Sequence, residues 1–158
     1  MALVTPDPLA ISLLVRWLLG WLLCQPMPAL PWLAPSGEPR VSVLIPARNE
    51  ALTLPRLLQA LALQSLQPLE VIVIDDHSSD ATAALAAAAG VKVLASEPLP
   101  AGWCGKTWAL HQGAAASSGE LLVFLDADTE PNPSFLARLI ANQQRQGGLV
   151  SVQPFHRT

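Results

Sequence analysis

After residue 40, the hydrophobic positions of the chain fall into short apolar runs that alternate with longer amphipathic stretches. The runs are aliphatic and rich in β-branched residues, which is typical of strands buried on both faces of a parallel sheet. They predict strands at residues 41–46, 71–75, 91–94 and 121–126, and the beginning of a fifth strand at residues 149–153.

The stretches between these runs have the spacing of helices. Leu54, Leu57, Leu58 and Leu61 lie on one face of the first predicted helix, and Thr53 is placed to cap its N-terminus. Further helices are predicted from residue 79 or 80 to residue 90, at residues 106–117 and at residues 133–146. Strands that alternate with helices of this length predict an α/β fold with a mainly parallel sheet over residues 40–158.

A different pattern occupies the N-terminus. Residues 9–24 read LAISLLVRWLLGWLLC, a hydrophobic helix that is interrupted only by Ser12, Arg16 and Gly20. A proline-rich stretch follows, and no continuous helix could pass through it. Residues 1–35 are therefore predicted to form a hydrophobic helix and a linker in front of the folded domain.

This hydrophobic helix is predicted to associate with a membrane. A full span needs about 20 apolar residues, so whether the helix crosses the bilayer or lies on it stays open. Trp17, Trp21 and Trp32 are of the residue type that favours membrane–water interfaces. No basic residue precedes the apolar stretch, as one would in a secretory signal peptide. The alternative is an ordinary helix packed against the domain.

Composition and charge narrow the classes of function. The chain has 158 residues, enough for one domain, and its net charge of −3 argues against a nucleic-acid-binding surface. The hydrophobic segment predicts a location at the cell membrane, and Arg40, Arg48 and Arg56, which follow it, favour a cytoplasmic position for the globular part. Cys24 and Cys104 have no metal-ligand spacing, which indicates a reducing compartment.

Two of the predicted strands end in paired acids. Residues 71–76 read VIVIDD and residues 121–128 read LLVFLDAD, so carboxylates follow directly after apolar runs. Carboxylates cannot stay unpaired in a core, and open α/β sheets bind ligands at the carboxyl ends of their strands. The two acidic strand ends are therefore expected to share one rim of the sheet, where they could hold a metal ion and a charged nucleotide.

Asp126 and Asp128 are the candidate metal ligands. Two carboxylates one residue apart at a strand end can bind Mg²⁺ or Mn²⁺, which takes its other ligands from water and from substrate phosphates. A cation held in this way neutralises the charge on a leaving diphosphate. The alternative for so short an acidic motif is a solvated strand end or a helix cap.

Three other segments carry candidate binding residues or exclude a function. Asp75 or Asp76 could accept hydrogen bonds from a base or a ribose, although DDHSSD is also a good polar turn. Lys106 could meet phosphate oxygens at a helix N-terminus, with a solvated lysine as the alternative. The segment PARNE after the first strand contains no glycine, which argues against the dinucleotide-binding motif of NAD and FAD proteins.

Four segments, in this order and spacing, resemble family 2 glycosyltransferases: VSVLIPARNE, VIVIDDHSSDATA, PLPAGWCGKTWALHQGAAASSGELLVFLDADT and GGLVSVQPFH. The resemblance runs from about residue 41 to the end. It is greatest to the membrane-associated bacterial branch of diaponeurosporenoate and hopene-associated glycosyltransferases. It implies the N-terminal half of a GT-A domain, with a Rossmann-like sheet that binds a UDP-sugar and a divalent metal. A lipid or carotenoid acceptor and transfer with inversion are implied as well.

The resemblance also implies roles for individual residues. Those implied to contact the nucleotide-sugar are Pro46, Arg48, Asp75, Asp76, Lys106 and Asp126. Pro46 and Arg48 would line the nucleoside site, and the aspartates after the second strand would hold the uracil or the ribose. The metal motif would be Asp126 and Asp128, with Asp128 as the direct ligand.

Members of this family continue well past the equivalent of residue 158 and supply there the general base that deprotonates the acceptor. Residues 40–158 are therefore expected to form a truncated domain that binds the donor, with the catalytic base beyond residue 158. Two alternatives stay open. One is a non-catalytic nucleotide-sugar-binding protein, and the other is a DxD phosphotransferase, whose pattern wants Thr or Val where Glu130 stands.

Overall fold

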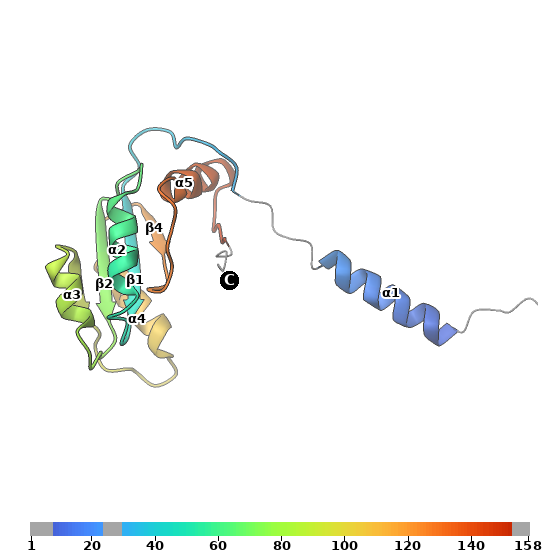
Figure 1. Ribbon diagram of the computed structural model, residues 1–158, viewed down its shortest axis with the longest axis horizontal. Helices are drawn as coiled ribbons and strands as arrows, with labels where there is room; N and C mark the ends of the chain where they lie inside the picture. Colours follow the sequence, from blue (N-terminus) through green and yellow to red (C-terminus); the bar gives the residue numbers. More distant parts are fainter. Residues whose placement is uncertain (1–7, 24–29, 153–158) are drawn as a thin grey trace, which may run out of the picture.

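The computed structural model describes residues 8–23 and 30–152, and within them a parallel sheet lies between helices (Figure 1). The strands are β1 (Val41–Ala47), β2 (Glu70–Asp75), β3 (Lys92–Ala95) and β4 (Leu121–Phe124). The helices are α1 (Pro8–Leu23), α2 (Leu54–Ala62), α3 (Thr82–Ala88), α4 (Gly105–Ala115) and α5 (Phe135–Gln146). The predicted α/β fold with a mainly parallel sheet is confirmed.

The order of the strands places a crevice in the sheet. The order is β3-β2-β1-β4, and each neighbouring pair is parallel. The chain therefore adds strands outward from β1 to β3 and then returns to add β4 on the other side of β1. Connections from neighbouring strands leave in opposite directions at such a reversal, which opens a crevice at the carboxyl ends of the two strands. A ligand site is expected beyond β1 and β4.

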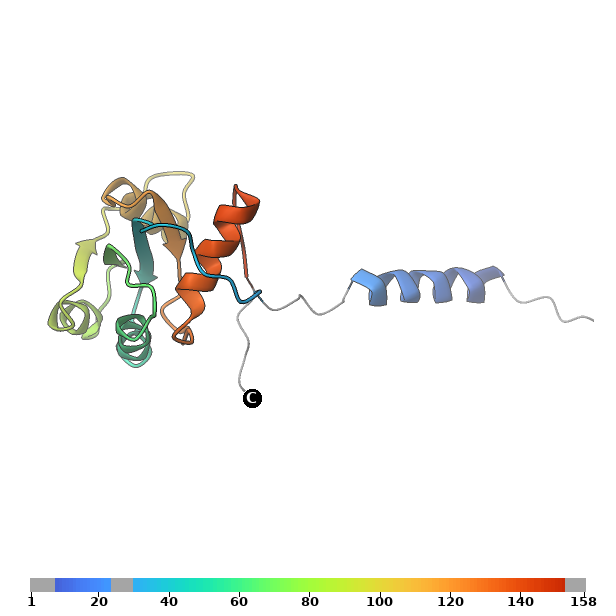
Figure 2. The same cartoon turned by 90° about the horizontal axis from the view of Figure 1, so that it is seen from above.

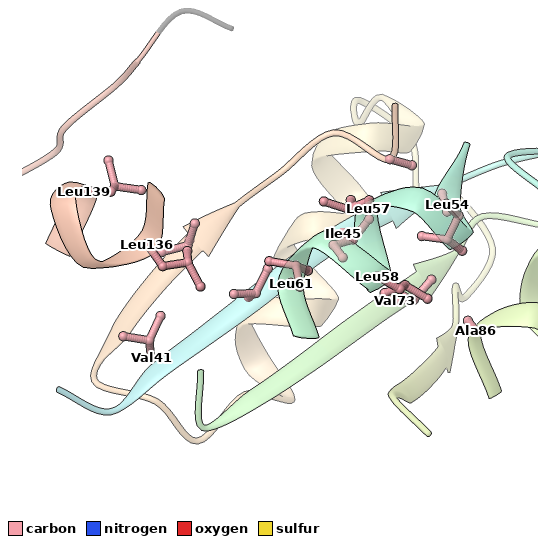
Figure 3. Close-up of a cluster of buried hydrophobic side chains, with 14 of the residues drawn as sticks. Val41, Ile45, Leu54, Leu57, Leu58, Leu61, Val73, Ala86, Leu136 and Leu139 are labelled. Carbon is pink, nitrogen blue, oxygen red and sulfur yellow. The ribbon is translucent and has the colours of Figure 1, made fainter. Parts of the chain in front are cut away.

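Side chains of the strands alternate between two differently covered faces. Val43 and Ile45 of β1 belong to a hydrophobic cluster with residues of α2, α3 and α5 (Figure 3). Leu44 points to the opposite face and packs with Ile72 of β2 and Ala109 of α4. Figures 1 and 2 show α2 and α3 side by side along the sheet. Strand β1 is therefore buried on both faces, as predicted.

The predicted helices of the domain are present, with some ends shifted. All four leucines on the predicted face of α2 are buried. Thr53 is at its N-cap, but the Thr53 side chain makes no capping bond and donates instead to the carboxylate of Glu50. Helix α3 begins only at Thr82, whose backbone N–H donates to Asp80 Oδ1 at 3.0 Å. Asp80 thus satisfies an N-terminal donor of α3 from a position just outside the helix.

Two strand predictions need correction. Residues 149–152 form no strand, and Gln153 lies outside the described residues. Val150 and Val152 pack against the hydrophobic cluster instead of pairing with the sheet. Strand β4 ends at Phe124, and it is buried on one face only, with Leu122 and Phe124 exposed by 38% and 47%. Helix α4 packs over β1 and β2, which leaves the β4 side of that face uncovered.

Helix α1 covers the hydrophobic N-terminal segment as far as Leu23, and Cys24 lies outside the described residues. Its large exposed side chains are Leu9, Leu13, Leu14, Val15, Trp17, Leu18 and Leu19. Figures 1 and 2 draw α1 apart from the sheet. Among the described residues, none of the helices has both the length and the apolar character that crossing a membrane requires.

Candidate functional site

A cavity of about 360 Å³ lies at the carboxyl ends of the strands, in the crevice beyond β1 and β4. Its lining residues are Pro46, Ala47, Arg48, Glu50, Asp76, Lys106, Ala109, Asp126, Ala127 and Asp128. All of the residues predicted to bind a ligand, except Asp75, line this one cavity. They come from the ends of β1, β2 and β4 and from the first turn of α4.

Asn49 holds the loop after β1 in place and was not singled out by the sequence analysis. It has a left-handed φ of 57°, a conformation that asparagine tolerates better than most residues. Its backbone N–H donates to Ser78 Oγ at 3.0 Å, and its side-chain Oδ1 accepts from Ser79 N at 2.8 Å. These bonds join the loop after β1 to the loop after β2 and fix the positions of Arg48 and Glu50 on either side of Asn49.

Asp80 ties the same two loops together a little farther from the cavity. Its carboxylate accepts from the backbone N–H groups of Thr82 and Ala51 and from the hydroxyl of Thr82. The Thr82 hydroxyl is the main reason that the pKa of Asp80 lies below its ordinary value. Glu50 N in turn donates to Thr82 Oγ1 at 2.8 Å. The side of the cavity formed by Glu50 is therefore supported by hydrogen bonds from the start of α3.

Asp76, directly after the end of β2, is the acidic residue of this segment that reaches the cavity. Its backbone N–H donates to Ala47 O at 2.8 Å, which continues the pairing of β2 with β1 beyond Asp75. Its carboxylate lies 3.9 Å from Arg48 Nη1 and 3.3 Å from His77 Nδ1. A Cβ atom added to Gly105 would lie only 2.9 Å from Asp76 Oδ2. The absence of a side chain at Gly105 thus lets the N-terminus of α4 approach this carboxylate.

Asp75 is placed differently from its neighbour. It does not line the cavity, and its Oδ1 is buried and has no hydrogen-bond partner among the described residues. Its backbone carbonyl accepts from Ser96 N at 2.9 Å, which extends the pairing of β2 with β3. A buried carboxylate oxygen without a partner is unusual, because most such atoms are hydrogen-bonded. A ligand donor could satisfy this acceptor only after the Asp75 side chain turns toward the cavity.

The loop before α4 positions Lys106. Gly102 adopts a φ of 85°, and Trp103 then packs against Trp108 and His111 of α4, with ring centroids 5.2 and 5.0 Å away. The indole N–H of Trp108 donates to Glu97 O at 3.1 Å, so the loop is fastened to the helix at both of its ends. Lys106 is consequently held on the first turn of α4, facing the cavity.

The motif Asp126-Ala127-Asp128 is anchored by its middle residue. Ala127 is buried in the hydrophobic cluster, while the side chains on either side of it are exposed at the cavity. Thr129 closes the turn, since its backbone N–H and its hydroxyl both donate to Asp126 O, at 3.1 and 2.7 Å. Lys106 Nζ lies 2.6 Å from Asp126 Oδ1. The turn therefore presents both carboxylates to the cavity, one of them already paired.

These residues fit a divalent metal that also binds the substrate. Within residues 8–23 and 30–152, no cluster of three or more His, Cys, Asp or Glu side chains could hold a metal ion. Among the described residues, Asp126 and Asp128 are the candidate ligands, and two carboxylates leave most coordination positions of the ion to other ligands such as water or substrate phosphates. Mg²⁺ and Mn²⁺ bind in this way, through one or two carboxylates and substrate phosphates.

Comparison with known sequences gives a matching family model and similar curated proteins. The model of the family described as "Glycosyl transferase family 2" matches residues 42–158. The chain is 40% identical over 121 residues to 4,4'-diaponeurosporenoate glycosyltransferase from Staphylococcus haemolyticus, covering 73% of this chain and 32% of that protein. The enzyme of the same name from Staphylococcus aureus strain MRSA252 is 37% identical over 75% of this chain. The chain thus spans about a third of the length of the curated relatives it matches.

Comparison with solved structures gives proteins with a similar fold. A glucosyl-3-phosphoglycerate synthase from Mycobacterium tuberculosis, in complex with Mn²⁺, UDP and glucosyl-3-phosphoglycerate, superimposes with a TM-score of 0.59 and 29% identity. The match covers 74% of this chain and 47% of the synthase. A complex of the synthase with Mn²⁺ and UDP-glucose superimposes with a TM-score of 0.58 and 32% identity over 69% of this chain and 40% of that chain. With the family model matched from residue 42 to residue 158, the chain belongs to glycosyl transferase family 2.

Proposed function

We propose that this chain binds a UDP-sugar together with Mg²⁺ or Mn²⁺, as the donor-binding half of a GT-A glycosyltransferase. The complete enzyme would transfer the sugar, with inversion at the anomeric carbon, to a lipid or carotenoid acceptor. The single observation that carries the proposal is the convergence of Arg48, Asp76, Lys106 and the two acids of the DxD turn on one cavity. That cavity lies at the crevice where sheets of this kind bind nucleotides.

We infer that one side of the cavity would accept the nucleoside and another the diphosphate. Pro46 and Arg48, with Asp76 opposite, would contact the nucleoside. Asp75 does not line the cavity, so its carboxylate would have to turn toward it to accept a hydrogen bond from the uracil or the ribose, which would give the buried Oδ1 a donor. Lys106 and the N-terminus of α4 would face the diphosphate, because backbone N–H groups at a helix N-terminus favour anions.

Asp126 and Asp128 would hold the metal. Structures of the synthase with Mn²⁺ and UDP, with Mn²⁺ and UDP-glucose, and with Mg²⁺ and UDP support a divalent ion in this fold. When bound, such an ion stabilises the negative charge that develops on a leaving diphosphate. The turn closed by Thr129 would keep the two carboxylates at a fixed separation, so that little order has to be gained when the ion binds.

The acceptor is proposed from the relatives. Both staphylococcal relatives are named for diaponeurosporenoate, and this chain matches about a third of their length. Membrane association is proposed from α1, where Leu13, Leu18 and Trp17 are among the exposed side chains that would lie in a membrane–water interface. A lipid or carotenoid acceptor would reach the enzyme from the same membrane.

Calorimetric titration of the purified chain with UDP, with and without Mn²⁺, tests the donor site. We expect saturable binding that requires Mn²⁺ and is weakened at least about tenfold in Asp128→Ala, because the variant removes a charged metal ligand. The matched control is Glu120→Ala, which removes an exposed acid at the opposite end of β4. This control is expected to bind UDP as the unmodified chain does.

Two results would contradict the proposed donor site. One is the absence of UDP binding by a chain whose circular dichroism shows it to be folded. The other is equal UDP affinity in Asp128→Ala and Glu120→Ala, which would place the metal elsewhere. Release of UDP from UDP-glucose in the presence of an acceptor is measured separately, so that donor binding and sugar transfer are judged independently.

A further inference from the structure

The pairing of Lys106 with Asp126 has a consequence for the order of binding. Lys106 Nζ lies 2.6 Å from Asp126 Oδ1, which is a full hydrogen-bonded ion pair. Both side chains line the same cavity, and they are exposed by 58% and 56%. The ammonium group therefore occupies one oxygen of a carboxylate that the proposed metal would need.

We propose that Lys106 acts as a resident cation on Asp126 in the ligand-free protein and moves to the diphosphate when a nucleotide binds. A divalent cation would then bind tightly only together with a nucleoside diphosphate. This inference rests on the proposed function and concerns the regulation of that same site.

The ammonium group of Lys106 and a metal ion compete for the Asp126 carboxylate, because both are cations. A metal ion that approaches Asp126 must displace the ammonium of Lys106 or bind close beside it, and either alternative weakens its affinity. Asp128 alone gives the ion one carboxylate, because the described residues contain no larger cluster of metal-ligating side chains. The free protein is therefore a poor metal site, although both of its acids face the cavity.

The position of Lys106 favours the transfer of its ammonium group from Asp126 to a diphosphate. Lys106 is the second residue of α4, so its long side chain starts where the backbone N–H groups of the helix point at the cavity. A diphosphate bound there offers the ammonium group several anionic oxygens in place of one carboxylate oxygen. Release of the Lys106 ammonium group from Asp126 frees the Asp126 carboxylate at the moment when the nucleotide brings further metal ligands.

The test measures Mn²⁺ binding without nucleotide, from the loss of the electron paramagnetic resonance signal of free aqueous Mn²⁺. Lys106→Met removes the ammonium group and keeps a side chain of similar length. We expect this variant to bind Mn²⁺ about fivefold more tightly than the unmodified chain, a gain of roughly 1 kcal/mol, typical of an exposed ion pair. Lys106→Arg retains the charge and is expected to bind Mn²⁺ as weakly as the unmodified chain.

Lys92→Met is the matched control for net charge. Lys92 lies on β3, where it contacts the carbonyl of Ala116 and the carboxylate of Glu70, and it does not line the cavity. Its replacement is expected to leave Mn²⁺ affinity unchanged. Adding Asp126→Asn to Lys106→Met is expected to abolish the gain, because the gain is made through the freed carboxylate.

The proposal is overturned if Lys106→Met binds Mn²⁺ no more tightly than the unmodified chain, or if Lys92→Met produces the same gain. A measurement of UDP affinity at saturating Mn²⁺ accompanies the test, and Lys106→Met is expected to weaken it several-fold. The proposed donor site fails if the unmodified chain binds no UDP with Mn²⁺. The Mn²⁺ affinities of the unmodified chain and its variants are compared without nucleotide. Failure of the proposed role of Lys106 is therefore distinguishable from failure of the proposed donor site.

Discussion

Gly105 is the residue at which the shape of the site depends most directly on the absence of a side chain. A Cβ atom at this position would lie 2.9 Å from Asp76 Oδ2, and the end of the Asp76 side chain would have to move. Because only a side-chain end is displaced, we expect Gly105→Ala to change the unfolding free energy little and to weaken UDP binding about three- to tenfold. Thermal unfolding and calorimetric titration with UDP measure the two effects.

A second glycine on the same helix provides the control. A Cβ atom on Gly113 would meet Ile74 Cδ1 at 2.7 Å, within the hydrophobic core between α4 and the sheet. Gly113→Ala is expected to lower the unfolding free energy by about 1–3 kcal/mol, as overpacking does, and to leave the UDP affinity of the folded protein unchanged. Equal UDP affinities in Gly105→Ala and the unmodified chain would show that the position of Asp76 does not govern nucleotide binding.

Individual residues also show how far the sequence predicts the site. Asp126, Asp128 and Lys106 could be found because each follows an apolar run or a glycine loop, and parallel strands bring such ends to one rim. Asn49 was missed, since its role depends on Ser78 and Ser79 of another loop, about 30 residues farther along the chain. A pairing of that kind arises only when the sheet has formed.

At the scale of elements, Glu70 joins the strands at the rim opposite the cavity. Its Oε1 accepts from Ser118 N at 2.6 Å, from Ser118 Oγ at 2.8 Å and from Ser42 Oγ at 2.7 Å. Its Oε2 lies 3.9 Å from Lys92 Nζ. The carboxylate thus connects β1, β2, β3 and the segment before β4. The Ser118 amide and then the Ser42 hydroxyl lower the pKa of Glu70 below its ordinary value.

This lowered pKa predicts a dependence of stability on pH. The folded state favours the charged carboxylate, so the stabilisation is fully present above the unfolded pKa of about 4.3 and is lost as pH falls through the lower folded pKa. Glu70→Gln is expected to lower the unfolding free energy at pH 7 by about 1–2 kcal/mol, because hydrogen bonds to a charged acceptor are replaced. Urea unfolding between pH 7 and pH 3 measures the difference between the two chains.

The difference in unfolding free energy between Glu70→Gln and the unmodified chain should shrink as the pH falls through the acid range. Asp80 also has a lowered pKa, and it is present in both chains, so its contribution cancels in the comparison. A difference that stays constant from pH 7 to pH 3 would show that the charge on Glu70 does not stabilise the strands.

The strands themselves were predictable to the extent that both of their faces are covered. β1 is buried on both faces, and its apolar run marks its ends closely. β4 has an equally apolar sequence, yet Leu122 and Phe124 are exposed, because a run of hydrophobic residues does not reveal how far a helix extends over a sheet. The strand predicted to begin at residue 149 was wrong for a related reason. Val150 and Val152 pack against the hydrophobic cluster without being part of a strand.

At the scale of the whole molecule, the segment before β1 connects α1 to a defined side of the domain. Arg138 Nε of α5 donates to Pro31 O at 3.3 Å, and the Arg138 guanidinium lies 5.8 Å from the ring centroid of Trp32. Ser36 N and Oγ both donate to Gln144 Oε1, at 2.9 and 3.1 Å. This part of the linker therefore runs along α5, so a membrane-bound α1 would hold the domain from its α5 side.

Sedimentation with vesicles of phosphatidylcholine and phosphatidylglycerol tests the attachment of α1 to a membrane. We expect the unmodified chain to sediment with the vesicles and the triple variant Leu13→Ser, Leu14→Ser, Leu18→Ser to lose more than about tenfold in affinity, because burial of each leucine contributes roughly 1.5–3 kcal/mol. The control, Leu63→Ser with Leu149→Ser, removes exposed leucines of the domain and should sediment like the unmodified chain. Equal losses in both variants would assign the attachment to general surface hydrophobicity, and no sedimentation of the unmodified chain would exclude α1 as an anchor.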